Sequence, residues 1–132
     1  LSTKNNFIFK FNNKNQLIKG DEDQLYRVFI NLIKNAEEAI GEKRSKNLEL
    51  KGNIAIELMK NNDYIEIIIK DNGVGVFDLK KVMTPYFTTK KNGTGLGLSI
   101  VEKIINEHGG EINIKNSKNG AEVLIDLPNI KS

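Results

Sequence analysis

The sequence predicts an α+β domain in which two amphipathic helices alternate with strands that pair as hairpins. Apolar residues recur at steps of three and four over 22–40 and again over 98–105, which is typical of helices with one buried face. Apolar and β-branched residues alternate over 54–70 and 111–127, each time around a cluster of turn residues. A chain of 132 residues is long enough for one hydrophobic core, so we expect a single domain.

The composition excludes several classes of function. There is no cysteine, which excludes disulfides, thiol nucleophiles and zinc–thiolate sites, and the single histidine, His108, excludes a multi-histidine metal site. A net charge of +3 with scattered lysines does not predict a nucleic-acid partner. No apolar run approaches the roughly 20 residues of a membrane span, and no secretory signal is present. The chain begins at Leu1 without an initiator methionine, so we expect a domain of a longer protein.

Residues 1–20 predict a short β-ribbon that serves as scaffold. Asparagines and a lysine over 12–15 mark a turn, and 17–19 can form the return strand. The first strand is indicated by alternating phenylalanines, namely Phe7, Phe9 and Phe11.

The first helix is expected over 22–40, with Asp21 as its N-cap. Asn31 and Asn35 lie four residues apart at the edge of its apolar stripe. Asparagine is a poor helix former, so two in register require a reason. They are either ordinary surface residues or amides whose oxygens bind a hard cation such as Mg²⁺. The apolar stripe comprises Leu25, Val28, Phe29, Leu32, Ile33, Ala36 and Ile40.

A polar loop is expected over 41–52, followed by strands over 54–58 and 64–70. The second strand leads directly into Asp71-Asn72-Gly73-Val74-Gly75. This segment can be a simple turn. It can also read a base, because a carboxylate fixed at a strand end accepts a hydrogen bond from an exocyclic amine such as adenine N6. The glycines would leave room for a flat ring.

A short helix is expected over 77–83, ended by Pro85. The segment 85–90, Pro-Tyr-Phe-Thr-Thr-Lys, has two interpretations. Its aromatic residues can anchor a mobile flap, with Lys90 as a point charge for phosphates. Alternatively, it is a plain loop with a buried aromatic pair and a solvated lysine.

Three alternating glycines over 93–97 precede the second helix. Glycine permits close approach of an anionic group, and the first turn of the helix offers N–H groups and the positive end of its dipole. The segment therefore predicts a phosphate site, although glycine-rich loops also occur as connectors. The helix should stop at Gly109-Gly110, with His108 in a structural role in its last turn. A hairpin over 111–127 closes the chain.

In this order and spacing, the motifs resemble the catalytic, ATP-binding domain of sensor histidine kinases. That domain belongs to the wider group of type II topoisomerases, heat-shock protein 90 and MutL ATPases. Asn31 to Ala36 is similar to the N box, and Asp71 to Gly75 to the first glycine box. Residues 85–90 and 93–98 are similar to the F box and the second glycine box. The resemblance covers about Gly20 to Pro128, and its details look most like the nitrogen-regulation type, NtrB and NtrY.

The resemblance implies a two-layer α/β sandwich of the Bergerat type, with a mixed, mostly antiparallel sheet and helices on one face. Residues 1–132 would form the whole catalytic domain, with the ribbon at 1–20 and an ATP lid at 76–98. The dimerisation domain that carries the acceptor histidine, and the sensor domain, would lie upstream and outside this chain.

The resemblance also implies the roles of individual residues. Asn35 would bind Mg²⁺, and Asn31 would contact the phosphates or a metal-bound water. Asp71 would read adenine N6, with Gly73 and Gly75 admitting the base. No catalytic residue is assigned with certainty, although Lys90 is a candidate phosphate stabiliser. The remaining nucleotide-binding residues would be Lys34, Val76, Gly93, Thr94, Gly95, Leu96, Gly97 and Leu98.

The implied function is to bind ATP and Mg²⁺ and to transfer the γ-phosphoryl group to a histidine on the dimerisation domain of the same two-component kinase, for relay to a response regulator. The domain would be cytoplasmic in a homodimeric protein that other segments can anchor in the inner membrane. Hydrolysing members carry a glutamate where this chain has Asn31, so we expect weak hydrolysis. The alternatives are an ATP-hydrolysing clamp and a degenerate regulatory nucleotide-binding module.

Three positions depart from the pattern of the family. Glu38 stands where many members have a basic residue. Ala121, after Gly120, stands where a hydroxyl is frequent near adenine, and Lys90 replaces an arginine. These departures leave the central motifs intact.

Overall fold

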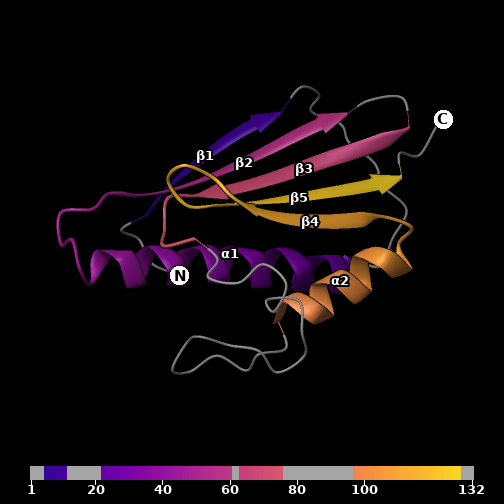
Figure 1. The fold of residues 1–132 in the computed structure, drawn as a ribbon. Coiled ribbons are helices and arrows are strands. Elements are labelled where there is room, and N and C mark those ends of the chain that lie inside the picture. The colour runs from indigo at the N-terminus through magenta and orange to yellow at the C-terminus, as the bar shows by residue number, and fades with distance from the viewer. Residues whose placement is uncertain (1–4, 12–21, 61–62, 76–96, 129–132) are drawn as a thin grey trace.

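In the part of the chain that the structure describes, a five-stranded sheet packs against two helices that both cover one of its faces (Figure 1). The structure, a computed structural model, describes residues 5–11, 22–60, 63–75 and 97–128. The elements are β1 (Asn5–Phe11), α1 (Glu22–Arg44), β2 (Gly52–Lys60), β3 (Tyr64–Asp71), α2 (Gly97–Glu107), β4 (Glu111–Asn116) and β5 (Ala121–Pro128).

The strand order is β1-β2-β3-β5-β4. The β1–β2 pair is parallel, and the other three pairs are antiparallel. The predicted two-layer α/β sandwich, with a mixed and mostly antiparallel sheet and helices on one face, is therefore confirmed. The short helix expected over 77–83 lies outside the described residues.

The hydrophobic core lies between the helices and the sheet. Alternate residues of β3 point toward the helices, because successive side chains of a strand face opposite sides. Each fully buried aliphatic side chain contributes about 1.5–3 kcal/mol, so this layer supplies most of the stability. The core comprises Leu25, Val28, Leu32, Ala36 and Ile40 of α1, Ile54, Ile65, Ile67 and Ile69 of the β2–β3 pair, Val101, Ile104 and Ile105 of α2, and Ile125 and Leu127 of β5.

The opposite face of the sheet carries a row of charges. Lys70 Nζ lies 2.9 Å from Glu57 Oε2 and 3.6 Å from Glu122 Oε1, and Lys115 Nζ lies 3.5 Å from Glu122 Oε2. The hydrogen bond to Glu57 is the main cause of a pKa of Lys70 above its usual value. Exposed pairs of this kind contribute at most about 1 kcal/mol each. The row marks the face that the helices leave open.

The first predicted strand is present, and among the described residues it is part of the main sheet. β1 is the edge of the main sheet, where it pairs in parallel with β2 and places Phe7 opposite Ile54. Phe7 packs against the core, and its ring stacks on that of Phe9 at a centroid distance of 6.5 Å. Burial of this ring favours the pairing of β1 with β2. The predicted return strand over 17–19 lies outside the described residues.

The expectation that α1 ends at Ile40 is wrong, because the helix continues through Gly41 to Arg44. The guanidinium of Arg44 ties this extra turn to the sheet. Its Nη2 donates to Asn5 Oδ1 at 2.8 Å, and its Nε donates to the Leu50 carbonyl at 3.3 Å. These bonds, together with basic residues at the negative end of the helix dipole, offset the cost of about 1 kcal/mol for a helical glycine.

Both predicted hairpins and the second helix are confirmed, with strand ends that extend by one or two residues. α2 ends as the glycine pair predicts. Gly109 has a positive φ of 76°, and the Gly110 amide donates to the Ile105 carbonyl at 3.0 Å.

We expect Gly41→Ala to raise the free energy of unfolding by about 0.5–1 kcal/mol, because alanine favours the helix and a Cβ here meets nothing within 4 Å. Urea denaturation measures the change. Gly52→Ala is the contrasting variant, since its Cβ would lie 2.7 Å from Ile40 and 2.9 Å from Arg44. A destabilised Gly41→Ala protein would contradict the helical assignment of residue 41.

Candidate functional site

The candidate site is built around the glycine loop, residues 71–75, at the end of β3. Asp71 is the last residue of this strand, and its Oδ1 accepts a hydrogen bond from the Gly73 amide at 2.8 Å. Short side chains that bond to the backbone two residues on form tight turns of this kind. The bond fixes one oxygen of the carboxylate at the strand end.

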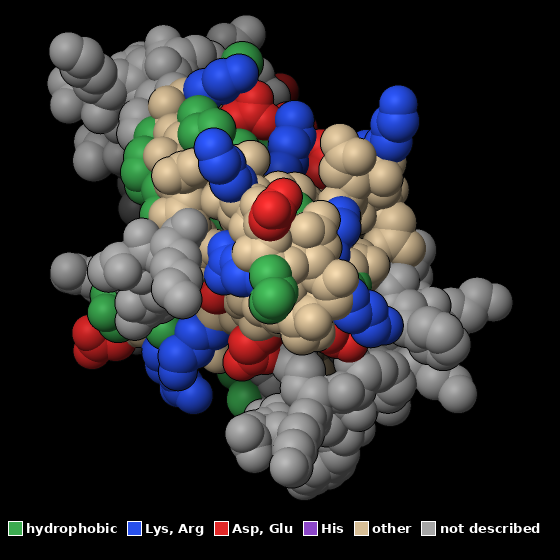
Figure 2. Space-filling model, turned by 90° about the vertical axis from the view of Figure 1, so that its left-hand side faces the viewer, with side chains coloured by type: hydrophobic (Ala, Val, Ile, Leu, Met, Phe, Trp, Pro, Cys, Tyr) green, Lys and Arg blue, Asp and Glu red, His purple; other side chains and the backbone are tan. Residues whose placement is uncertain are grey.

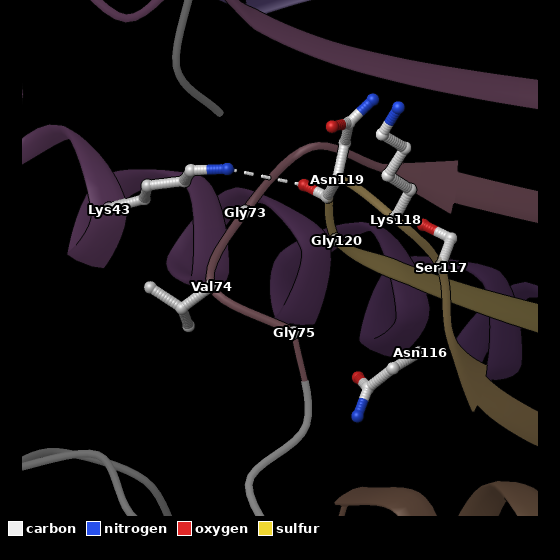
Figure 3. A pocket seen from close by; sticks show the side chains of 9 residues that line it. All are labelled: Lys43, Gly73, Val74, Gly75, Asn116, Ser117, Lys118, Asn119 and Gly120. Atoms are coloured by element: carbon white, nitrogen blue, oxygen red, sulfur yellow. Dashed lines mark hydrogen bonds between the residues drawn. The ribbon is translucent and has the colours of Figure 1, made fainter.

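The glycine loop lies directly on α1 (Figure 3). The Val74 amide donates to the Ala39 carbonyl at 3.2 Å. A Cβ on Gly73 would lie 2.5–2.7 Å from three atoms of Ala39, two of them backbone, so only glycine allows this approach. Gly75 has a positive φ of 82°, and a Cβ there would lie 2.9 Å from Asn116 Oδ1. Both glycines are required by contacts of the loop with the protein itself.

The two asparagines of α1 lie on the helical row that leads to this contact. Asn31, Asn35 and Ala39 follow one another at steps of four and therefore share one face of the helix. With a rise of 1.5 Å per residue, about 12 Å of helix separates Asn31 from Ala39. Both asparagines are half-buried, whereas Lys34 is exposed. One helix thus carries the predicted phosphate-binding residues and holds the predicted base-reading loop.

Of the predicted lid residues, Val76, Lys90 and Gly93 to Leu96 lie outside the described residues. Gly97 begins α2, and Leu98 packs against the core from the first turn of this helix. His108 follows the end of α2, where its Nδ1 lies 2.8 Å from the Ile104 carbonyl oxygen. This local contact agrees with the predicted structural role of the histidine.

The turn between β4 and β5 forms a further wall, of which the resemblance placed only Gly120 and Ala121 near the adenine. Gly120 packs on the backbone of Asp71, and Lys43 Nζ donates to the Asn119 carbonyl at 3.2 Å. Between this turn and the glycine loop lies a cavity of about 250 Å³ (Figure 3). Its lining comprises Lys43, Gly73, Val74, Gly75, Asn116, Ser117, Lys118, Asn119 and Gly120.

The electrostatics of this end of the molecule are mixed. Figure 2 shows basic side chains spread among polar and acidic ones, with few apolar side chains between them. Val74, 47% exposed, is an apolar residue of the cavity lining. Ala121, at the start of β5, is buried, and Glu38 is exposed on α1. The surface therefore offers both hydrogen-bond donors and acceptors around the glycine loop.

Comparison with known proteins assigns the chain to a family. The family model described as "Histidine kinase-, DNA gyrase B-, and HSP90-like ATPase" matches residues 20–131. Sensor histidine kinase ZraS of Salmonella typhimurium is 40% identical over 124 residues, which are 91% of this chain and 25% of ZraS. Sensory histidine kinase/phosphatase NtrB of Rhizobium leguminosarum is 38% identical over 120 residues, 82% of this chain and 31% of NtrB. The chain thus spans between a quarter and a third of these relatives.

Solved structures agree with this assignment. The catalytic domain of histidine kinase ThkA, in a nucleotide-free form, has a TM-score of 0.82 and 34% identity, covering 96% of this chain and 80% of that one. ThkA in complex with the response regulator protein TrrA matches with a TM-score of 0.76 and 31% identity, covering 94% of this chain and 34% of that one. The chain therefore belongs to the histidine kinase-, DNA gyrase B- and HSP90-like ATPase family, within which it resembles the catalytic domains of sensor histidine kinases.

Proposed function

We propose that this domain binds Mg-ATP and transfers the γ-phosphoryl group to a histidine on a separate dimerisation domain of a two-component sensor kinase. One observation carries the proposal. The glycine loop, which begins with Asp71, is packed on the same helix that carries Asn31 and Asn35. Groups suited to a base and groups suited to phosphates are thereby held at a fixed separation by one rigid element.

At the base end, Asp71 accepts a hydrogen bond from the exocyclic amine of adenine. The turn to Gly73 restrains the carboxylate before the nucleotide arrives, which lowers the entropic cost of binding. A hydrogen bond to a charged acceptor contributes about 1.5–3 kcal/mol, enough to select adenine over a base with a carbonyl at the same position.

At the phosphate end, Asn35 holds Mg²⁺ and Asn31 contacts the phosphates or a metal-bound water. A half-buried amide oxygen suits a hard cation that takes most of its ligands from phosphates and water. Lys34 and Lys90 add positive charge. The glycine-rich segment 93–97 leads into the N-terminus of α2, where backbone N–H groups and the helix dipole favour anions.

The chain is suited to transfer of the phosphoryl group more than to hydrolysis. Phosphoryl transfer needs mainly positioning and neutralisation of charge. The amide of Asn31 cannot deprotonate and so cannot act as a general base for water. His108 lies at the end of α2 and is followed by Gly109 and not by an acidic residue, so we assign the acceptor histidine to the dimerisation domain. A response regulator then receives the phosphoryl group, a relay supported by the ThkA–TrrA complex.

The rest of the proposal concerns the setting of the domain. No helix within the described ranges is long and apolar enough to cross a bilayer. We place the domain in the cytoplasm, as part of a homodimer whose other segments provide sensing and any membrane anchor. Nucleic acid is not among the proposed partners.

The central test supplies Mg-ATP labelled at the γ-phosphate, with and without the dimerisation domain of the same protein. We expect label on the acceptor histidine and little free phosphate when the acceptor is absent. Rapid steady-state hydrolysis by the domain alone would instead indicate an ATP-driven clamp. No binding of a non-hydrolysable ATP analogue at millimolar concentration would leave only a regulatory module without nucleotide.

Asp71→Asn should reduce the preference for ATP over GTP, because a carboxylate acceptor becomes an amide that can also donate. A loss of roughly tenfold or more in ATP affinity is expected, as for a charged hydrogen bond. Calorimetric titration with both nucleotides measures the change. Unchanged affinities for ATP and GTP would exclude a base-reading role for Asp71.

Gly73→Ala should weaken nucleotide binding, because its Cβ would collide with the backbone of Ala39 and lift the loop from α1. Overpacking of this kind costs about 1–3 kcal/mol of stability, and displacement of the loop misplaces Asp71, so we expect ATP affinity to fall by roughly tenfold, the factor of one lost hydrogen bond. Gly41→Ala is the matched control. Gly41 lies on α1, like Ala39, but a Cβ there meets nothing within 4 Å, so this variant should bind ATP normally. Equal affinities for the two variants would show that contact between loop and helix is dispensable.

A further inference from the structure

Asn72 lies inside the glycine loop, yet its side chain is directed to the protein backbone. Its Oδ1 accepts a hydrogen bond from the Asn53 amide at 2.8 Å, and its Nδ2 donates to the Lys51 carbonyl at 2.8 Å. The last backbone pair of the β2–β3 ladder joins Ile54 and Asp71. The side chain of Asn72 therefore continues this ladder one step beyond its end.

The segment to which Asn72 is bonded, residues 51–53, is itself fixed to the rest of the fold. Gly52, between the two bonded residues, pairs with Asn5 of β1. Arg44, at the end of α1, bonds to the carbonyl of Leu50 and to the side chain of Asn5, a polar residue only 7% exposed. Asn72 thus anchors the loop to a corner where β1, β2 and the end of α1 meet.

The two neighbours of Asn72 in the chain are the ends of the turn that restrains the carboxylate. Asp71 precedes it, and Gly73, which donates to the Asp71 carboxylate, follows it. α1 holds the loop on one side through the bond from Val74 to Ala39. Asn72 holds it on the other side through β2. Without the second attachment, the part of the turn beyond the last ladder pair, Ile54 with Asp71, keeps its bond to the helix but loses its bonds to the β2 side.

We propose that Asn72 is a positioning residue for base recognition, which acts through Asp71 and does not touch the nucleotide. This inference rests on the proposed function, because it requires that Asp71 reads adenine. The Oδ1 and Nδ2 atoms of Asn72 are bonded to Asn53 and Lys51. Through these bonds Asn72 controls the orientation of the Asp71 carboxylate. A merely structural residue would instead affect stability and all nucleotides alike.

The test measures dissociation constants of Mg-ATP and Mg-GTP by calorimetry for the wild-type chain and for Asn72→Ala. We expect ATP affinity to fall by roughly tenfold, the factor that corresponds to one hydrogen bond, while GTP affinity changes less than about twofold. Asn53→Ala is the matched control. It removes an exposed side chain but keeps the backbone N–H that Asn72 uses, and it should leave both affinities unchanged.

A double-mutant cycle with Asp71→Asn separates action through Asp71 from an independent effect. If Asn72 acts by aiming the carboxylate, Asn72→Ala in the Asp71→Asn background should change ATP affinity by less than about twofold. Additive losses would overturn the proposal. An equal loss for ATP and GTP, or an unchanged ratio of the two affinities, would overturn it as well.

Asn72→Asp provides a second variant in case Asn72→Ala does not fold, which thermal unfolding reports. It keeps the acceptor for the Asn53 amide and loses the bond to Lys51, so we expect a smaller fall in the ATP-to-GTP ratio in the same direction. A wild-type chain that binds no ATP would refute the proposed function itself, whereas normal binding with an unchanged ratio in both variants would refute only the role of Asn72.

Discussion

The contact between Gly73 and Ala39 is the constraint on which the site depends. It brings the glycine loop at the end of β3 against the backbone of α1. The bond from the Val74 amide to the Ala39 carbonyl fixes the position of the loop along the helix. The same helix buries its apolar stripe in the core, so its position is set by the largest stabilising term in the fold. The position of the glycine loop is therefore set by the hydrophobic packing of α1 in the core.

Local patterns were sufficient to predict most of the fold. Apolar residues recur at steps of three and four in α1 and at every second position in β3. Each pattern indicates that one face is buried, and both can be seen in the sequence itself. They did not predict the parallel pairing of β1, because its partner lies more than forty residues away in the chain. They also predicted an end of α1 at Ile40, because one of the bonds of Arg44 that support the last turn is made to Asn5, 39 residues away in the chain.

The site was predicted to a similar extent and for a similar reason. Asp71 and the glycines were visible as a motif, but the motif suggested room for a ligand, whereas the structure fills the space at Gly73 with α1. The attachment of Asn72 and the wall formed by 116–119 were not predicted, since both depend on which segments the sheet places side by side. Tertiary neighbours, and not residue types, define these contributions.

The uninterrupted course of α1 has a consequence for how this domain can change in evolution. Asn31, Asn35 and Ala39 share a face only because the number of residues between them is fixed. One inserted residue would turn everything beyond it by about 100° and move the asparagines away from the loop. The stretch from Asn31 to Ala39 is therefore fixed in length, and only the residues between the two asparagines and Ala39 can vary in side chain. The connection after Arg44 is bonded at Leu50 and Lys51, so changes in its length are expected before Leu50.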